Sequence, residues 1–162
     1  MPATALKVNK VGETELAMER TFEAPRDLVW RAWTEAEHLL QWWGPKDYPT
    51  TYCKVDLRVG GVWHYCMTGP GGDEAWAKAT YREIAAPERL AYTDAFSDKD
   101  GNEYPPISEV RMTFIDQGNK TLMQGTTVFA SAADRDKVIE MGIEEGMASS
   151  LERLDEHLKT LT

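Results

Sequence analysis

Hydrophobic and polar residues alternate along residues 14–23, and one position on the hydrophobic side, Arg20, is charged. A period of two predicts an amphipathic strand with one face turned toward a core. Residues 1–13 show no such pattern. We therefore expect them to form a flexible lead-in to a single domain that spans residues 14–162.

Two short helices are predicted after this strand. Pro25 suits the first position of a helix because its ring presets the backbone angle, and apolar residues at helical spacing continue to Trp33. The segment Thr34–Glu37 has the form of a capping box and predicts a second helix over Glu35–Trp42. Gly44-Pro45 then ends that helix.

The pattern changes between residues 49 and 130, where short segments rich in Val, Thr, Tyr and Trp are separated by turn residues. This spacing is typical of hairpins, so we expect an antiparallel meander. The predicted strands are Thr51–Val59, Val62–Thr68, Glu74–Ile84, Arg89–Phe96, Ser108–Asp116 and Thr121–Phe129.

Apolar residues at helical spacing predict one long helix at the C-terminal end, with Ser131 or Asp134 as its N-cap. Roughly 28 residues would give a helix of ~40 Å. The fold class is thus α+β, with about seven strands in a curved antiparallel sheet wrapped on this helix. We expect a cavity between the two, because side chains cannot easily fill the space inside a curled sheet.

Six short motifs occur within this order of elements: Arg20–Pro25, Val29–Thr34, His38–Pro45, Asp56–Gly61, Tyr81–Leu90 and Gly142–Leu154. Taken together, they make residues 14–161 resemble the START-like (SRPBCC, helix-grip) superfamily. Within it, the chain is similar to the group named for the activator of heat shock protein 90 ATPase. Met147 stands where such sequences often carry Trp, which would leave more room at the cavity floor.

The resemblance implies the helix-grip fold and a hydrophobic pocket, but no particular substrate. The eukaryotic activator has a separate N-terminal domain that engages the chaperone. A chain of 162 residues has no length for that domain, so we do not expect co-chaperone activity to carry over.

Charge and composition exclude several classes of function. The net charge of −9 offers no broad basic face for nucleic acid or for an anionic membrane surface. The first ten residues contain no apolar stretch typical of a secretory signal, so we expect a cytoplasmic protein. Cys53 and Cys66 lack metal or redox spacing and are interpreted as small buried side chains.

No metal or cofactor is expected. His38, His64 and His157 are far apart and form no zinc-type pair. The segment Asp98–Gly101 has the wrong register for a calcium loop and is interpreted as a turn. The glycine motifs that hold phosphate groups are absent from the sequence.

Aromatic residues are the most informative side chains, because six Trp and six Tyr exceed what a core of this size usually needs. Their alternation along the strands predicts which of them face inward. Ordinary core packing remains the alternative for any one of them. The candidate ligand-binding residues are Trp33, Trp63, Tyr65, Met67, Trp76, Tyr92, Asp94, Met112, Phe114, Ile143 and Met147.

The role of three local features stays open. Asp94 is the first candidate for a raised pKa if it faces inward. Gly142 and Gly146 either let the last helix approach the sheet rim, or leave an entrance beside it, or are simply tolerated. The segment Trp42–Pro45 forms one lip of an opening or pins the second helix to the sheet.

These observations favour a protein that binds a small hydrophobic or aromatic molecule. An enzyme of the cyclase, aromatase or hydrolase type on the same scaffold is one alternative. A chaperone-associated interaction module is another. No catalytic residue can be assigned, and a homodimer and a chaperone partner both stay open.

Overall fold

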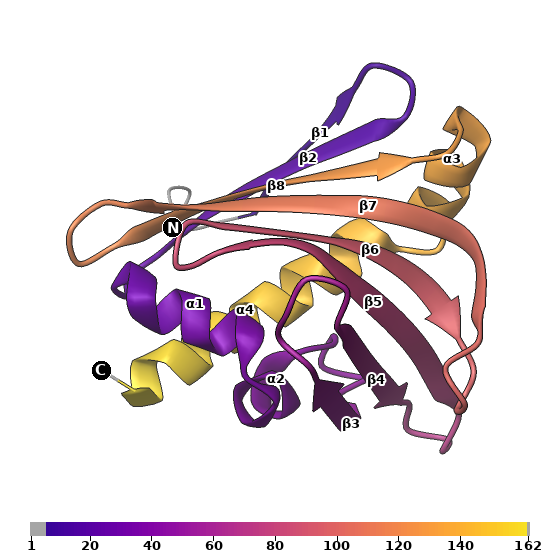
Figure 1. The fold of residues 1–162 in the computed structure, drawn as a ribbon, viewed down its shortest axis with the longest axis horizontal. Helices are drawn as coiled ribbons and strands as arrows, with labels where there is room; N and C mark the ends of the chain where they lie inside the picture. The colour runs from indigo at the N-terminus through magenta and orange to yellow at the C-terminus, as the bar shows by residue number, and fades with distance from the viewer. Residues whose placement is uncertain (1–5, 162) are drawn as a thin grey trace.

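The computed structural model describes residues 6–161, which form an eight-stranded antiparallel sheet and four helices (Figure 1). The strands are β1 (Lys7–Val11), β2 (Glu15–Phe22), β3 (Thr50–Val55), β4 (Val62–Thr68), β5 (Glu74–Ala85), β6 (Arg89–Ser97), β7 (Glu103–Asp116) and β8 (Thr121–Phe129). The helices are α1 (Arg26–Thr34), α2 (Ala36–Trp42), α3 (Ala132–Glu140) and α4 (Ile143–Leu161).

The strands lie in the order β1-β2-β8-β7-β6-β5-β4-β3, so β2 joins the meander through β8. Figure 1 shows the sheet curving around α4, which crosses its concave side, while α1 and α2 lie at one end of the sheet. This α+β architecture confirms the predicted helix-grip fold. No helix within residues 6–161 is long and apolar enough to cross a membrane.

The sheet has one strand more than expected, because residues 7–11 of the predicted lead-in form β1. This strand pairs with β2, and Lys7 lies opposite Glu19 with 3.9 Å between the charged atoms. Four of its five residues are exposed, so it lacks the inward face that gives a strand its alternating pattern. Residues 1–5 of the lead-in lie outside the described part of the chain.

The C-terminal helix is broken, and the prediction of one continuous helix of about 28 residues was wrong. Ser131 caps α3 as expected, since its hydroxyl accepts a hydrogen bond from the Asp134 amide at 3.1 Å. The break falls at Gly142, whose φ of 89° lies in the left-handed region that glycine adopts without a steric penalty. Gly142 thus ends α3, and α4 begins in a new direction (Figure 1).

The predicted capping box at Thr34–Glu37 does not form. The Thr34 hydroxyl instead donates to the carbonyl oxygen of Trp30, one turn back in α1, at 2.8 Å. Glu35 is the N-cap of α2 and makes no side-chain capping bond. The two helices were nevertheless predicted within two residues of their ends, because their apolar spacing does not depend on the cap.

A cluster of indole rings fixes α1 and α2 against the sheet. Trp33 packs edge-on against Trp42 and Trp43, with ring centres 4.8 and 5.4 Å apart. Trp42 also donates from Nε1 to the carbonyl oxygen of Ala32 at 2.9 Å. Trp42 therefore holds α2 against α1. Trp43 packs on Trp63 of β4 with ring centres 4.8 Å apart, so this segment pins α2 to the sheet, as one of its two interpretations expected.

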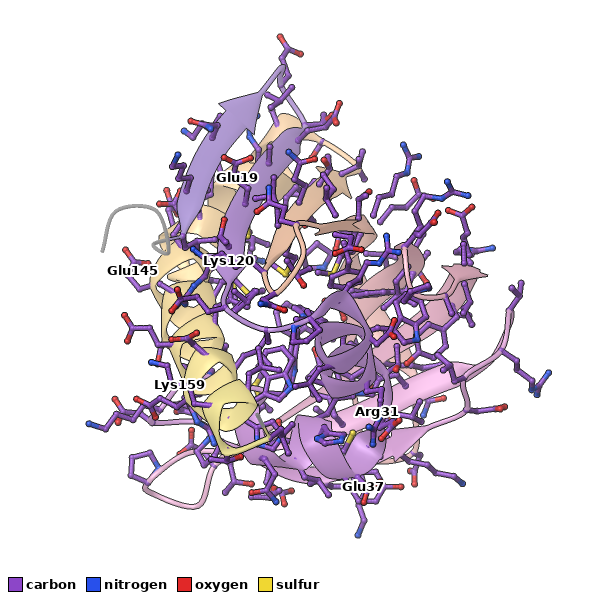
Figure 2. The ribbon with its side chains drawn as sticks, turned by 90° about the vertical axis from the view of Figure 1, so that its left-hand side faces the viewer. Glu19, Arg31, Glu37, Lys120, Glu145 and Lys159 are labelled. Carbon is purple, nitrogen blue, oxygen red and sulfur yellow. The ribbon has the colours of Figure 1, made fainter. Side chains whose placement is uncertain are left out.

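The guanidinium group of Arg153 fastens α4 to the last turn of α2 and to the segment that follows it. It donates to the carbonyl oxygens of Gln41 at 3.0 Å and Gly44 at 2.8 Å. Most other charged side chains point away from the body of the protein, as Glu37, Glu145 and Lys159 do in Figure 2. Arg153 thus helps the buried inner face of α4 to hold the helix in place over the sheet.

Two glycine substitutions test the break between α3 and α4. Gly142→Ala should lower the free energy of unfolding by about 1–2 kcal/mol, because a β-carbon is disfavoured at a positive φ. Gly146→Ala should raise it by up to about 1 kcal/mol, because alanine is the better helix former. A β-carbon at Gly146 would meet only Pro45, at 4.0 Å.

Urea denaturation of both variants measures these changes. A single uninterrupted helix would predict that both substitutions stabilise the protein, and that result would contradict the break.

Candidate functional site

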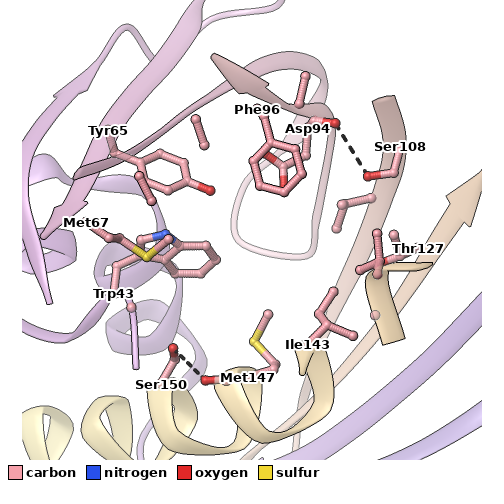
Figure 3. A pocket seen from close by; sticks show the side chains of 18 of the residues that line it. Trp43, Tyr65, Met67, Asp94, Phe96, Ser108, Thr127, Ile143, Met147 and Ser150 are labelled. Atoms are coloured by element: carbon pink, nitrogen blue, oxygen red, sulfur yellow. Dashed lines mark hydrogen bonds between the residues drawn. The ribbon is translucent and has the colours of Figure 1, made fainter. Parts of the chain in front are cut away.

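A pocket with a volume of about 340 Å³ lies between the concave face of the sheet and the helices α3 and α4 (Figure 3). Most of its lining is apolar. The lining residues come from β2, from α1, from the segment after α2, from β4 to β8, and from the C-terminal part of the chain that contains α3 and α4. Two of its lining residues, Phe96 and Met141, are 41% and 60% exposed and mark its rim.

Small residues next to large ones explain why space remains. In the β4–β5–β6 register, Tyr65 lies opposite Ala77, and Ala79 lies opposite Asp94. Residues that face each other across antiparallel strands point to the same side. The alanines of β5 therefore leave the centre of the inner face open, while tyrosines stand at its sides. Gly125 on β8 has the same effect opposite Met112.

Nine of the eleven predicted ligand-binding residues line this pocket, and strand parity predicted most of them. Trp63 and Phe114 do not line it, although both are buried. The Trp63 ring packs between Trp43 and Tyr65, each 4.8 Å away, and Phe114 packs on Trp30 at 5.9 Å. The nine lining residues are Trp33, Tyr65, Met67, Trp76, Tyr92, Asp94, Met112, Ile143 and Met147.

Trp76 borders the pocket, but its ring packs on the opposite face of the sheet. It lies opposite Cys66 in the register, and its ring contacts Tyr52 and His64 at 5.4 and 5.0 Å between centres. Its indole Nε1 donates to Glu74 at 3.3 Å. The inward orientation expected for this indole is therefore wrong. The sequence correctly separated Trp76 and Lys78 from the alanines of β5, but the alanines are the residues that face inward.

Several lining residues were not among the sequence candidates. Trp43, Gly44 and Pro45 form one side of the pocket, so the segment after α2 serves both of the roles considered for it. The alternating residues of β8 are a signal from which its inward side could be identified. The principal residues missed are Met18, Trp43, Pro45, Ala77, Phe96, Ser108, Met123, Gly125, Thr127, Phe129, Met141 and Ser150.

Asp94 is the single carboxyl group among the described residues that line the pocket. Its Oδ1 atom is closed off from solvent and has no hydrogen-bond partner within residues 6–161. Burial raises the pKa of Asp94 to about 7, and a hydrogen bond from the Ala95 backbone partly opposes this rise. The carboxyl group therefore changes charge near neutral pH.

Two tyrosines share the environment of this carboxyl group. Burial raises the pKa of Tyr65 and of Tyr92 well above the usual range, and the negative charge of Asp94 raises both further. Both phenols are therefore neutral at physiological pH and can donate hydrogen bonds. In Figure 3 the Tyr65 ring reaches into the pocket from the side opposite Ser108 and Thr127.

The structure brings together two histidines that the sequence keeps 119 residues apart. His38 Nδ1 on α2 and His157 Nε2 on α4 are 2.9 Å apart. Within residues 6–161, no group of three or more metal-ligating side chains forms a metal site. The two cysteines are free, and burial raises the pKa of the Cys53 thiol to about 11, which leaves it protonated and weakly nucleophilic.

Comparisons with known proteins give a consistent assignment. The family described as "Activator of Hsp90 ATPase homolog 1-like protein" matches residues 23–159. No curated protein matches the chain. Among solved structures, a protein from Arthrobacter aurescens is 31% identical, with 97% of this chain and 93% of that chain covered and a TM-score of 0.90.

Two further solved structures agree with it. A protein from Nitrosomonas europaea is 28% identical, with 93% of this chain and 97% of that chain covered and a TM-score of 0.83. A protein from Mycobacterium smegmatis is 29% identical, with 93% of this chain and 96% of that chain covered and a TM-score of 0.82. These structures share the fold along nearly their whole length.

The raised pKa of Asp94 predicts a pH-dependent difference between the protein and its Asp94→Asn variant. The folded protein keeps the Asp94 proton up to about pH 7, whereas the unfolded chain releases it near 3.8. Between these values the contribution of Asp94 to stability falls as pH rises. The two proteins should unfold alike at pH 4, and the variant should be the more stable by on the order of 3 kcal/mol at pH 7.5.

Urea denaturation of both proteins at each pH measures this difference. Subtracting the free energies of unfolding of the two proteins cancels the contributions of titrating groups that both contain. One such group is His157, whose pKa is lowered by burial and by His38, so that its contribution to stability rises with pH. A difference that does not change with pH would show that Asp94 is solvated in the folded protein.

Proposed function

The chain belongs to the Activator of Hsp90 ATPase homolog 1-like family, and we propose that it binds a small hydrophobic or aromatic molecule in the pocket beneath α4. The apolar, aromatic-lined pocket is the observation that carries this proposal. Its volume of about 340 Å³ is at the low end of the ~300–1,000 Å³ typical of ligand pockets. A ligand of one or two rings suits this size.

The lining residues support such a ligand in two ways. The rings of Trp33, Trp43, Tyr65 and Tyr92 offer flat apolar surfaces, and aromatic pairs of this kind favour stacked and edge-on contacts. Met67, Met112 and Met147 add flexible thioethers that adapt to irregular shapes. Burying an apolar ligand against these surfaces removes water from both partners, which is the main driving force of the binding.

The two alternatives considered from the sequence have less support. Acid–base or nucleophilic catalysis needs several polar groups that converge on one point. Apart from Asp94, the described lining contains no histidine, lysine or cysteine that could act with it. A chaperone-associated module would depend on a docking surface. The family description names an activator of a chaperone ATPase, but the proposal for this chain does not depend on that activity.

Filling the pocket from β8 should abolish binding. Gly125 has an ordinary strand conformation, and a β-carbon there would meet Met112 Cγ at 3.8 Å and the Arg111 carbonyl oxygen at 3.9 Å. The side chain of Gly125→Leu would therefore occupy pocket space without strain. We expect the wild-type protein to bind neutral naphthalenes with one site, and the variant to bind them at least tenfold more weakly, by isothermal titration calorimetry.

Gln124→Leu is the matched control. Gln124 directly precedes Gly125 on β8, so its side chain points to the opposite, exposed face of the sheet and lies outside the pocket. It should leave the affinity unchanged. The probes are naphthalene, 2-methylnaphthalene and 2-naphthylmethanol, and native mass spectrometry of freshly purified protein would show a co-purified molecule. A wild-type protein that binds none of the three and carries no such molecule would contradict the proposal.

A further inference from the structure

The charge of the pocket limits which ligands it can accept, provided that the proposed function holds. Among its described lining residues, Asp94 is the single group with a full charge, and no Lys, Arg or His faces it there. The protein as a whole carries a net charge of −9. Both the pocket and its surroundings therefore favour a positively charged ligand over a negatively charged one.

The neighbours of Asp94 on the adjacent strands leave its Oδ1 atom without a protein donor. Ala79 lies opposite it on β5 and has no polar side-chain atom. Ser108 lies opposite it on β7, but its hydroxyl is directed to the backbone oxygen of Asp94 at 3.5 Å, not to the carboxyl group (Figure 3). An unpartnered buried carboxylate oxygen is costly, and a donor on a ligand would remove that cost.

Aromatic rings lie around the same end of the pocket. The phenols of Tyr65 and Tyr92 lie close enough to Asp94 to feel its charge. Phe96, two residues after Asp94 on β6, also lines the pocket, and its exposure places it at the rim. Ring faces attract cations, and a carboxylate set among rings is a typical arrangement for binding an ammonium group.

From this arrangement we infer that the ligand is an amine, with its protonated nitrogen bound to Asp94 and its apolar or aromatic body packed against the rings and methionines of the pocket. The ammonium group supplies the donor that Oδ1 lacks, and its charge keeps the carboxyl group ionised. A ligand with a carboxylate at the same end would instead meet a like charge without any cationic side chain to offset it.

Three probes that share one ring system separate charge from hydrophobicity: 2-naphthylmethylamine, 2-naphthylmethanol and 2-naphthoate. Isothermal titration calorimetry at pH 7.5 should show that the amine binds at least tenfold more tightly than the alcohol. The carboxylate should bind at least tenfold more weakly than the alcohol. Asp94→Asn should reduce the ratio between amine and alcohol to less than threefold.

Glu109→Gln is the matched control for net charge. Glu109 lies on β7, one strand from Asp94, and its half-exposed side chain pairs with Arg111 on the outer face at 3.6 Å. This variant removes the same charge without touching the pocket, so it should keep the full preference for the amine. Urea denaturation of both variants shows that they are folded.

Each outcome supports or overturns the inference. An amine that binds no better than the alcohol, or a preference that survives Asp94→Asn, would overturn it while leaving the proposed function intact. Amine binding that survives Gly125→Leu would show attachment to the acidic surface and would also overturn it. If none of the three probes binds to the wild-type protein, the proposed function itself fails.

Discussion

The packing of α4 against the sheet is the interaction on which the rest of the structure depends. The C-terminal half of this helix is buried through Leu151, Leu154 and Leu158, whereas residues 143–149 are only partly buried. One half of the helix therefore closes the core, and the other half covers the pocket without filling it. Arg153 lies in the closed half and ties it to the chain after α2. The buried half of the helix thus sets the distance between α4 and the sheet over the pocket.

The strands and their inward faces could be predicted from the sequence because both depend on local patterns. Turn residues bounded β4 and β8 to the residue, and a period of two placed Tyr65, Tyr92 and Met112 on the inner face. The same argument gave the wrong side for Trp76. It assumed that the larger side chains of β5 face inward, but this strand contributes its alanines to the interior. Parity divides a strand into two faces, and only the neighbouring strands decide which face is inside.

Other features depend on contacts between distant parts of the chain, and local patterns do not encode them. The strand β1 is an exposed edge that forms because β2 offers it free backbone groups, not because it has a hydrophobic face. Ile139 and Ile143 stand four residues apart on either side of Gly142, as they would in one helix, so the pattern of apolar residues does not reveal the break. The contact between His38 and His157 requires α2 and α4 to meet, which follows only from the complete fold.

Asp94 connects the stability of the fold to its proposed use. A carboxyl group whose pKa rises to about 7 on folding makes the protein less stable at neutral pH than it would be with a neutral side chain. Residues that lower stability in this way are often found at functional sites, where the group is needed for a purpose other than folding. A cationic ligand would remove part of this cost when it binds, because it restores to the carboxylate the partner that the sheet does not provide. Ligand binding and stability are then linked by mass action, and the empty pocket is the less stable state.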